Sequence, residues 1–455
     1  MKLLIAAAVV VAMVISALPA QQGPLPPPRP AKPGQEQPGS DRDPVDVLVH
    51  LRDEVLRHAT RIPNYTCLET VDRDIYQWAG EPPKSCDSIL GRRKKAELSV
   101  LLKKMRSDRL RLDVLLTSVQ EVYSWAGAGK FEDIEIDQLI PEGAMGTGPF
   151  ATHLLNLFET RNPRFVFDGD ASEGGRQLME FSFTVPLAES HYRIKGHNGW
   201  VTTGYSGTLL VDALTSELVK LNVRTDELAP ETGQCETDTE LKYGKVPLGG
   251  IDYLLPLATR QRFIGRDGIE AENQVAFSAC HEFRGESTLL VEDHGEGKPK
   301  TRPAAPPEPL KLPLGLPISI EILAEIHAAE AAAGDMFEAR LKKPILDQRQ
   351  KLLVAAGARI DGRLMRVELR HANPEYTVAM RLETIEIDGV KHPLSVTPNR
   401  RTRDLRTTTK GGLRDRGIEI ELPLPSETHY GVYHFSGVNA VIPRGFETQW
   451  TTATP

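Results

Sequence analysis

Alternation of apolar and polar residues predicts β-strands over much of the chain. Residues 179–185 place Met, Phe, Phe and Val at every second position, with Glu, Ser and Thr between them. Residues 219–224 repeat this pattern, which is typical of a strand with one buried face. Residues 208–211 form a further strand, and residues 212–216 form the turn of a hairpin. We therefore expect an antiparallel sheet in this region.

Two more strands are predicted after this hairpin. One begins near Tyr253, directly after the turn Gly249-Gly250, and the other lies within residues 273–291. They extend the strand-rich region to about residue 290.

Helical spacing of apolar residues occurs in two places. Asp43-Pro44 opens a helix, because aspartate caps free backbone amides and proline is tolerated in the first turn. Apolar residues then recur at helical spacing as far as Ile62-Pro63, so one face should pack on the sheet. A second helix is predicted near residues 150–160, and residues 97–111 fit either a helix or a strand.

Short strands separated by turns mark the last third of the chain. Residues 316–323 predict the first strand. The alternation within residues 376–387 shifts by one position, which predicts a β-bulge near Thr384. Residues 418–424 alternate again. Turns at this spacing predict a small closed barrel or a sandwich.

The first twenty residues have the features of a secretory signal. Residues 1–20 combine a positive start, a short apolar core and a small residue before a polar stretch, with cleavage expected after Ala20. The alternative is an uncleaved membrane anchor, but the apolar run is shorter than the ~20 residues that span a bilayer. We expect a periplasmic or extracellular protein with no transmembrane segment in the mature chain.

Proline-rich stretches divide the remainder. Residues 21–42 predict a disordered leader, and residues 291–313 predict an extended linker that holds six prolines. The linker separates a larger domain, residues 43–290, from a smaller one, residues 314–450. The expected fold class is mostly β (α+β): an antiparallel half-barrel with covering helices, followed by a small β-barrel or sandwich.

Four cysteines enter an oxidising compartment if the chain is exported, so disulfides are favoured over a metal site. The residues are Cys67, Cys86, Cys235 and Cys280, and they allow three pairings. We expect Cys67–Cys86 and Cys235–Cys280, because each pair lies within one stretch of predicted strands.

Two segments resemble catalytic motifs, but neither segment matches its motif fully. Residues 204–208 resemble the GxSxG turn of serine hydrolases, but threonine takes the last position and a hairpin follows in place of a helix. His281-Glu282 begins like HExxH, yet Gly285 stands where the second histidine is needed. The sequence therefore predicts no catalytic, cofactor-binding or metal-binding residue.

Three weaker patterns also have simpler interpretations. The acidic residues Glu132-Asp133, Glu135 and Asp137 lack the turn glycine of a calcium loop, and a solvated acidic face is preferred. Residues 143–148 are glycine-rich but lack the ending of a phosphate loop. Asn64 begins a glycosylation triplet, which carries little information without the source.

Residues 400–416 form the most distinctive charge feature of the chain, with a net charge of +5. Their basic residues are Arg400, Arg401, Arg403, Arg406, Lys410, Arg414 and Arg416. A solvated loop is the preferred interpretation, and contact with anionic lipid head groups or an acidic polymer is the alternative. The net charge of −7 argues against general nucleic-acid binding.

Residues 43–290 resemble a known type of exported protein. The resemblance rests on a helix followed by antiparallel strands, on the hairpin GTLLVDALTSELVKLNV, and on the segment GGIDYLLP. They are similar to exported bacterial proteins with a fold like that of the periplasmic lipoprotein carrier LolA. The resemblance implies a half-closed barrel covered by helices, with an apolar cavity for acyl chains. It assigns no ligand-contacting residue.

A second resemblance covers residues 314–395. The segments AAAGDMFEARLKKPI and LLVAAGARIDGRLMRVEL are similar to the β-domain of TrbI-type envelope proteins. The chain departs from that family because no transmembrane anchor follows the export signal.

These features together predict a non-enzymatic exported protein of the envelope. The expected partner is an apolar or lipidic ligand, or another envelope protein, and no cofactor is expected. One alternative is a scaffold module that docks through an edge strand of the smaller domain. Another is an enzyme whose site forms only in the folded chain.

Overall fold

The computed structural model describes residues 42–454, apart from residues 60, 96–97, 118–119, 132–133, 147–151, 161–162, 197–198, 284–311 and 400–428. The signal, the basic segment 400–416 and the strand predicted at 418–424 lie outside the described residues, as do nearly all of the leader and of the linker. Among the described residues, no helix is long and apolar enough to cross a membrane.

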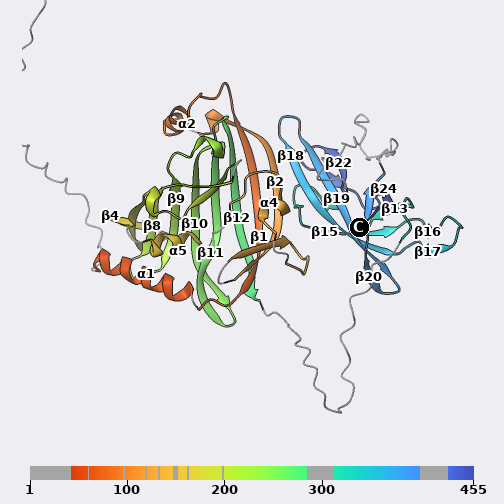
Figure 1. Cartoon of the computed structure of the whole chain (residues 1–455), viewed down its shortest axis with the longest axis horizontal. Helices are drawn as coiled ribbons and strands as arrows, with labels where there is room; N and C mark the ends of the chain where they lie inside the picture. The colour runs from red at the N-terminus through yellow and green to blue at the C-terminus, as the bar shows by residue number, and fades with distance from the viewer. Residues whose placement is uncertain are drawn as a thin grey trace, which may run out of the picture. The chain divides into compact units, whose positions relative to one another are not determined.

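The alternating segments before residue 290 form one antiparallel sheet (Figure 1). Ten described strands pair in the order β4, β5, β8, β9, β10, β11, β12, β1, β2, β3. Their bounds are β1 Tyr65–Trp78, β2 Leu102–Leu116, β3 Glu121–Trp125, β4 Arg164–Glu173, β5 Arg176–Val185, β8 Tyr205–Asp212, β9 Leu218–Thr225, β10 Gln234–Leu248, β11 Ile251–Gly265 and β12 Ile269–Glu282. A separate hairpin joins β6 Arg193–Gly196 to β7 Gly199–Thr202. The mostly β fold class is confirmed.

The predicted alternation is visible in β5. Met179, Phe181, Phe183 and Val185 are at most 2% exposed, because every second side chain of a strand points to the same face. The turn between β10 and β11 is Gly249-Gly250, and both residues have positive φ, which glycine adopts without steric cost.

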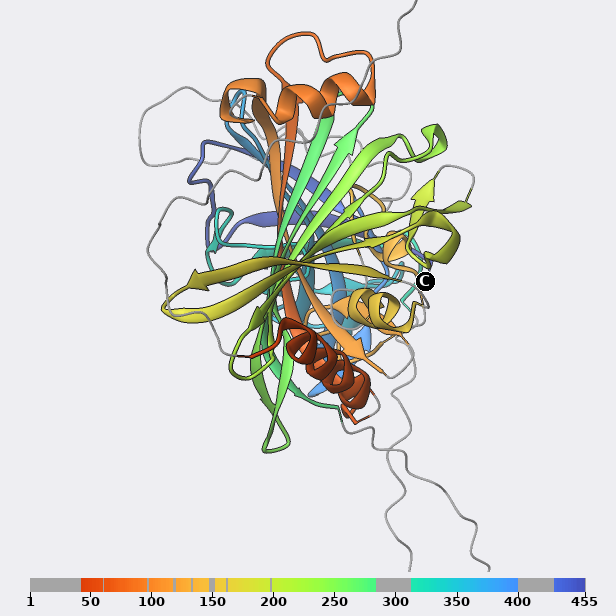
Figure 2. The same cartoon turned by 90° about the vertical axis from the view of Figure 1, so that its left-hand side faces the viewer.

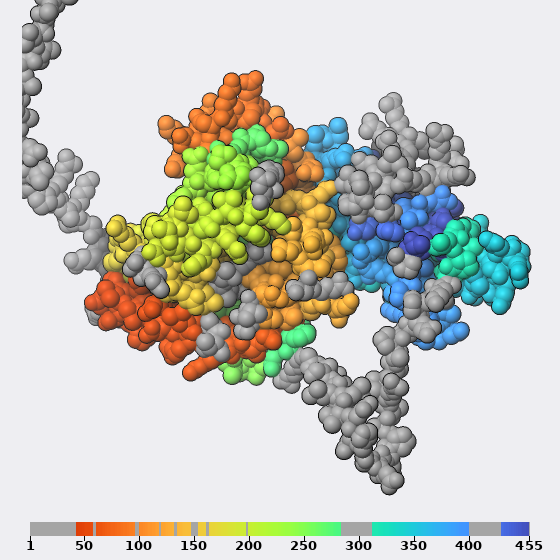
Figure 3. Space-filling model, in the orientation of Figure 1, coloured from red at the N-terminus to blue at the C-terminus, as the bar shows by residue number. Residues whose placement is uncertain are grey.

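Five described helices adjoin this sheet, and two of them cover one of its faces. Their bounds are α1 Pro44–Ala59, α2 Cys86–Arg93, α3 Leu98–Leu101, α4 Ile136–Leu139 and α5 Thr152–Glu159, with 3₁₀ turns η1 Leu187–Glu189 and η2 Pro230–Thr232. Figure 2 shows α1 and α5 on the same side of the strands, and α1 forms the lower left of the surface in Figure 3. Residues 97–111, which fitted either type of element, hold α3 and the first part of β2.

The helix α1 begins at the predicted Asp43-Pro44 and ends before the predicted boundary at Ile62-Pro63. The Asp43 carboxylate accepts a hydrogen bond of 2.8 Å from the backbone N–H of Val45, which caps the helix. Val47 and Leu51 are at most 1% exposed and pack with α5 against β5, β8 and β9. Ile62 lies beyond the end of α1 and packs on a neighbouring cluster under β1 and β2.

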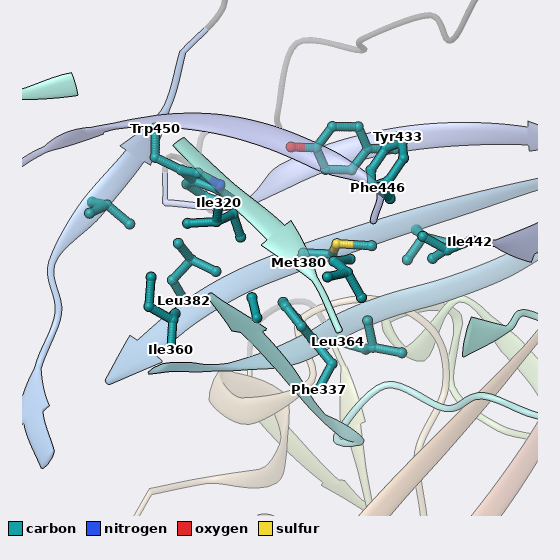
Figure 4. Close-up of a cluster of buried hydrophobic side chains, with 14 of the residues drawn as sticks. Ile320, Phe337, Ile360, Leu364, Met380, Leu382, Tyr433, Ile442, Phe446 and Trp450 are labelled. Atoms are coloured by element: carbon teal, nitrogen blue, oxygen red, sulfur yellow. The ribbon is translucent and has the colours of Figure 1, made fainter. Parts of the chain in front are cut away.

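The last third of the chain forms a second antiparallel row. Its strands pair in the order β22, β19, β18, β15, β13, β24, β21, with β20 beside β19. The bounds are β13 Pro317–Ile322, β14 Ile326–His327, β15 Met336–Leu341, β16 Ile345–Leu346, β17 Leu352–Val354, β18 Arg359–Arg370, β19 Glu375–Ile387, β20 Val390–Pro393, β21 Val396–Pro398, β22 Gly431–Ser436, β23 Val441–Ile442 and β24 Glu447–Thr452. They enclose one apolar core that includes Met380, Phe446 and Trp450 (Figure 4).

The bulge in β19 is confirmed. Asp361 of β18 pairs with Thr384, and the next residue, Gly362, pairs with Leu382. Glu383 is therefore the extra residue, and it lies next to the predicted position.

Contacts join the two β parts, and residues 40–455 form one compact unit. Residues 106–108 of β2 pair with residues 368–370 of β18. Arg363 is 2% exposed and donates to the carbonyl of Ala126 at 2.5 Å and to that of Gly334 at 2.6 Å. The division proposed between residues 290 and 314 stays a prediction.

The expected disulfide pairing is wrong. The bonds are Cys67–Cys280 and Cys86–Cys235, with sequence separations of 213 and 149 residues. The antiparallel order places β1 directly beside β12, so the first and last strands of the larger part carry one bond. The other ties the start of α2 to the start of β10. Proximity in sequence was a poor guide because the sheet pairs strands that are far apart along the chain.

Candidate functional site

Four polar side chains cross the helix-covered face of the sheet in one line. Pairing sets Arg73 of β1 beside Asn273 of β12, Asn273 beside Gln261 of β11, and Gln261 beside Thr239 of β10. Their exposed fractions are 6%, 0%, 4% and 4%. We call these four residues the polar row. Buried polar groups are costly unless they are hydrogen-bonded, so their partners decide what the row does.

Apolar side chains flank the polar row on the same strands. Because residues two positions apart share a face, each side of the row has its own line of neighbours. These neighbours are Val71, Val275, Thr259 and Leu241 on one side and Ile75, Ala271, Phe263 and Thr237 on the other. The face is thus a polar band between two mostly apolar bands.

Residues 142–146, which we call the strap, lie on this polar band. Nη1 of Arg73 donates to the Glu142 carbonyl at 2.7 Å, and Nδ2 of Asn273 donates to the Ala144 carbonyl at 2.8 Å. Side chains of the row therefore bind backbone carbonyl oxygens of an extended segment.

Glycines let the strap approach the row closely. A Cβ on Gly143 would lie 2.6 Å from Nη1 of Arg73, and Gly143 has a positive φ of +84°. A Cβ on Gly146 would lie 2.3 Å from Nε2 of Gln261. Any larger residue at either position has to displace a side chain of the row.

Part of the hydrogen-bonding capacity of this face is unused. Oδ1 of Asn273, Oγ1 of Thr259 and Oγ1 of Thr237 are buried and have no hydrogen-bond partner among the described residues. Each such atom costs about 1–3 kcal/mol. Unsatisfied buried groups at one place are typical of a site that a ligand or water completes.

A cleft of about 250 Å³ meets the polar row at Arg73. Nε and Nη2 of Arg73 form a two-pronged ion pair with the Asp108 carboxylate, at 2.7 and 2.6 Å. The remaining wall is mixed, because Leu110, Trp125 and Met365 are apolar whereas Arg106, Arg366 and Glu368 are charged. Glu142 and Gly143 of the strap also line the cleft, so the cleft and the row share one cover.

A buried carboxyl lies further along β1. Glu69 is 2% exposed, and its Oε2 has no hydrogen-bond partner among the described residues. Burial, and to a lesser degree the charge of Glu121, raises the pKa of the Glu69 carboxyl to about 8. Glu121 itself accepts a hydrogen bond of 2.7 Å from the Tyr123 hydroxyl. At neutral pH Glu69 is therefore a neutral carboxylic acid.

A buried histidine lies in the first turn of α5. The His153 ring stacks on Tyr192 with 5.4 Å between ring centres. Burial lowers the pKa of His153 to about 4, so the imidazole is neutral at physiological pH.

One serine–histidine contact occurs at the junction of β2 and β18. Oγ of Ser107 lies 2.7 Å from Nε2 of His371 and donates to the Asp74 carboxylate at 2.5 Å. A nucleophilic serine has to give its proton to the histidine. Here the single hydroxyl proton is directed to Asp74, so His371 acts as the donor and the contact fixes the junction.

The described residues of the rejected motifs form ordinary structural contacts. His281 bonds to Thr66 at 2.9 Å, and no cluster of three metal-ligating side chains occurs in the described part of the chain. Ser206 lies within β8, as its interpretation as part of a hairpin predicts. Asp137 forms an ion pair with Lys195. The seven basic residues of 400–416 lie outside the described ranges and stay a prediction.

The polar row was not found from the sequence, although a signal exists. In β1 the buried positions alternate, and Cys67, Val71 and Ile75 have the expected apolar character. Glu69 and Arg73 lie at the same parity. The alternation predicts that both positions are buried. A charged residue at such a position is therefore the sequence signal for this face.

No known family model matches the chain, and no curated protein matches it. Two solved structures are similar to about half of it, each at 10% identity. A DUF1329 family protein from Desulfovibrio piger ATCC 29098 covers 54% of this chain and 96% of its own length, with a TM-score of 0.25. A protein domain from Vibrio parahaemolyticus, named for outer membrane lipoprotein sorting, covers 50% and 90%, with a TM-score of 0.22. The name of the second agrees with the LolA-like resemblance expected for residues 43–290, and at these scores neither likeness extends to function.

Proposed function

We propose that the protein is a non-enzymatic binding protein that holds a lipid-like ligand on the helix-covered face of its larger sheet. The observation that supports this most strongly is the strap. Arg73 and Asn273 donate to carbonyl oxygens of Glu142 and Ala144, beside a cleft whose wall is partly apolar. A ligand with carbonyl groups and apolar chains would satisfy the same donors and the same walls.

The ligand chemistry follows from the two kinds of surface. The donors of the polar row suit an ester or amide carbonyl, and the flanking apolar bands suit a hydrocarbon chain. The unsatisfied oxygens of Asn273, Thr259 and Thr237 suit hydroxyl or amide donors of a head group. An acylated molecule combines all three features.

The size of the cleft requires the strap to move. Small-molecule sites commonly enclose ~300–1,000 Å³, and the cleft encloses about 250 Å³ with the strap in place. Displacement of residues 142–146 would join the cleft to the polar row and expose donors that the strap now occupies. In this proposal the strap and the ligand compete for the same groups.

Native mass spectrometry of the purified chain with a palmitoyl lysophospholipid tests the proposal. The wild type should form a one-to-one adduct. Asn273→Leu removes the amide without changing the side-chain size greatly, and should weaken the adduct at least tenfold. Gln274→Leu is the matched control, because the next residue on β12 is exposed and lies on the opposite face.

Circular dichroism of both variants would verify that they are folded. A wild-type chain that forms no adduct would contradict the proposal. Equal adducts for the two folded variants would contradict it as well.

The compartment belongs to the same proposal. The described residues contain two disulfides, and disulfides persist in oxidising compartments. Together with the signal predicted at residues 1–20, this supports export to the periplasm or beyond. Fractionation of cells that express the full chain would test it, and recovery of reduced, uncleaved protein from the cytosol would contradict it.

A further inference from the structure

The strand β4 ends the larger sheet and has a free edge. Residues 164–173 pair with β5 along the whole strand, from Arg164 with Thr184 to Glu173 with Arg176. No other described strand pairs with β4. In Figure 1 the strand lies at the far left of the sheet, and Figure 2 shows the β4–β5 hairpin reaching beyond the helices (olive, left). A row of backbone N–H and C=O groups is thus available for a further strand.

Aromatic contacts hold this edge in place. Phe165 packs on Phe158 of α5 at 5.9 Å and on Phe183 of β5 at 6.3 Å, measured between ring centres. Phe167 packs on Phe181 at 5.5 Å. The strand is therefore ordered before any partner arrives, which lowers the entropic cost of adding a strand to it.

The exposed side chains of β4 include an apolar pair and several acids, besides Arg164 and Ser172. Val166 is 57% exposed and Phe167 is 41% exposed, so the first half offers apolar surface. Asp168, Asp170 and Glu173 make the second half acidic. Natural sheets protect free edges with charges and bulges, and Asp168 is also the bulged residue between Phe167 and Gly169.

These acids disfavour pairing of β4 with a second copy of itself. A two-fold antiparallel pair centred on Asp168 sets that residue opposite its own copy. One centred on Gly169 brings Asp168 of each copy close to Asp170 of the other. Like charges held this close are destabilising, and these two registers overlap nearly the full strand. A strand with basic side chains at the same positions is attracted instead.

We propose that β4 is a docking edge that accepts an extended segment of a partner protein, with basic residues opposite Asp168 and Asp170. Strand addition supplies main-chain hydrogen bonds, and alternate side chains supply selectivity. The apolar residues of the partner would cover Val166 and Phe167. This edge is separate from the polar row and the cleft, so it does not depend on the proposed ligand.

Fluorescence anisotropy with two labelled ten-residue peptides tests the proposal on the full mature chain. One peptide alternates lysine and valine, and the other alternates glutamate and valine. The lysine peptide should bind and the glutamate peptide should not. The double variant Asp168→Lys/Asp170→Lys should bind the lysine peptide at least tenfold more weakly and should gain binding of the glutamate peptide.

A charge-matched control separates docking at the edge from general attraction to an acidic protein. Glu240→Lys/Asp252→Lys changes the net charge equally at acids on β10 and β11. This control should leave the affinity for the lysine peptide within about twofold of the wild type. Equal losses in the two double variants would overturn the proposal.

Hydrogen exchange locates the bound peptide. Binding should slow amide exchange within residues 164–173 and leave β2 and β18 unchanged. Binding without slower exchange in residues 164–173 would overturn the proposal. A dimer of the unliganded chain that protects the same residues would also overturn it, because the edge would then serve a second copy.

Discussion

Arg73 connects the parts of the candidate site. Its guanidinium bonds to the Asp108 carboxylate and to the Glu142 carbonyl, and its side chain is 7% exposed. Buried ion pairs add little to stability as a pair, but loss of one partner leaves the other charge buried and uncompensated.

Replacement of Arg73 by leucine should therefore be costly. We expect Arg73→Leu to lower the free energy of unfolding by about 3 kcal/mol. Arg109→Leu is the control, since its pair with Asp72 is 32% and 50% exposed and should contribute less than ~1 kcal/mol. Urea denaturation of both variants measures the difference, and equal losses would contradict the role given to Arg73.

Glu69 should give stability a dependence on pH. Its pKa is raised from 4.5 to about 8 in the folded chain, so the folded state binds more protons than the unfolded state between these values. Stability should then fall as pH rises from about 4.5 to about 8, by up to about 1.4 kcal/mol per unit. Glu69→Gln keeps the size and removes the titration.

Comparison of wild type and Glu69→Gln by urea denaturation at pH 5 and pH 8 isolates this effect, because other groups titrate in both proteins. The variant should gain stability relative to the wild type at the higher pH. A difference that is the same at both pH values would show that Glu69 is ionised in the folded chain.

The strap contacts the polar row through its backbone more than through its side chains. Gly146→Ala would place a Cβ against the buried Gln261 side chain, so we expect a loss of about 1–3 kcal/mol. Gly80→Ala is the control, because nothing lies within 4 Å of its Cβ position and the change should stay within ~0.5 kcal/mol. Thermal unfolding compares the two variants, and similar midpoints would contradict close docking of the strap.

The helix α2 depends on its disulfide. Cys86 joins Cys235 across 149 residues of chain, a small cluster with Trp78, Ile89 and Ile264 packs beneath the helix, and Arg93 forms an ion pair with Glu270. Replacement of both cysteines by serine should lower the free energy of unfolding by about 5 kcal/mol. Urea denaturation under oxidising conditions measures this, and a loss below 1 kcal/mol would show that packing and the Arg93–Glu270 ion pair hold α2 without the disulfide.

Elements differ in how well the sequence predicts them. The strand β5 and the bulge in β19 follow from local alternation, since each depends on residues within a few positions. The disulfides do not, because Cys67 meets Cys280 only after β1 has paired with β12. The local sequence does not predict the strap either, because its glycines are required only when Arg73 and Gln261 lie beneath them.

For the whole molecule, the sequence predicts the mostly β class and the covering helices, and the fold confirms both. The assembly of the site requires four strands and a loop from residues 73, 142–146, 239, 261 and 273. These segments are far apart in sequence, and only the sheet order brings them together. Glu69 and Arg73 are charged residues at positions of β1 that alternation predicts to be buried, and they are a local sign of this assembly.

The central claim is that a lipid-like ligand and the strap compete for the polar row. Hydrogen exchange of residues 142–146, measured with and without a palmitoyl lysophospholipid, tests this most directly. Displacement of the strap by the ligand predicts faster amide exchange in residues 142–146 and slower exchange in the cleft-lining part of β2. Unchanged exchange in the strap at saturating lysophospholipid would contradict the claim.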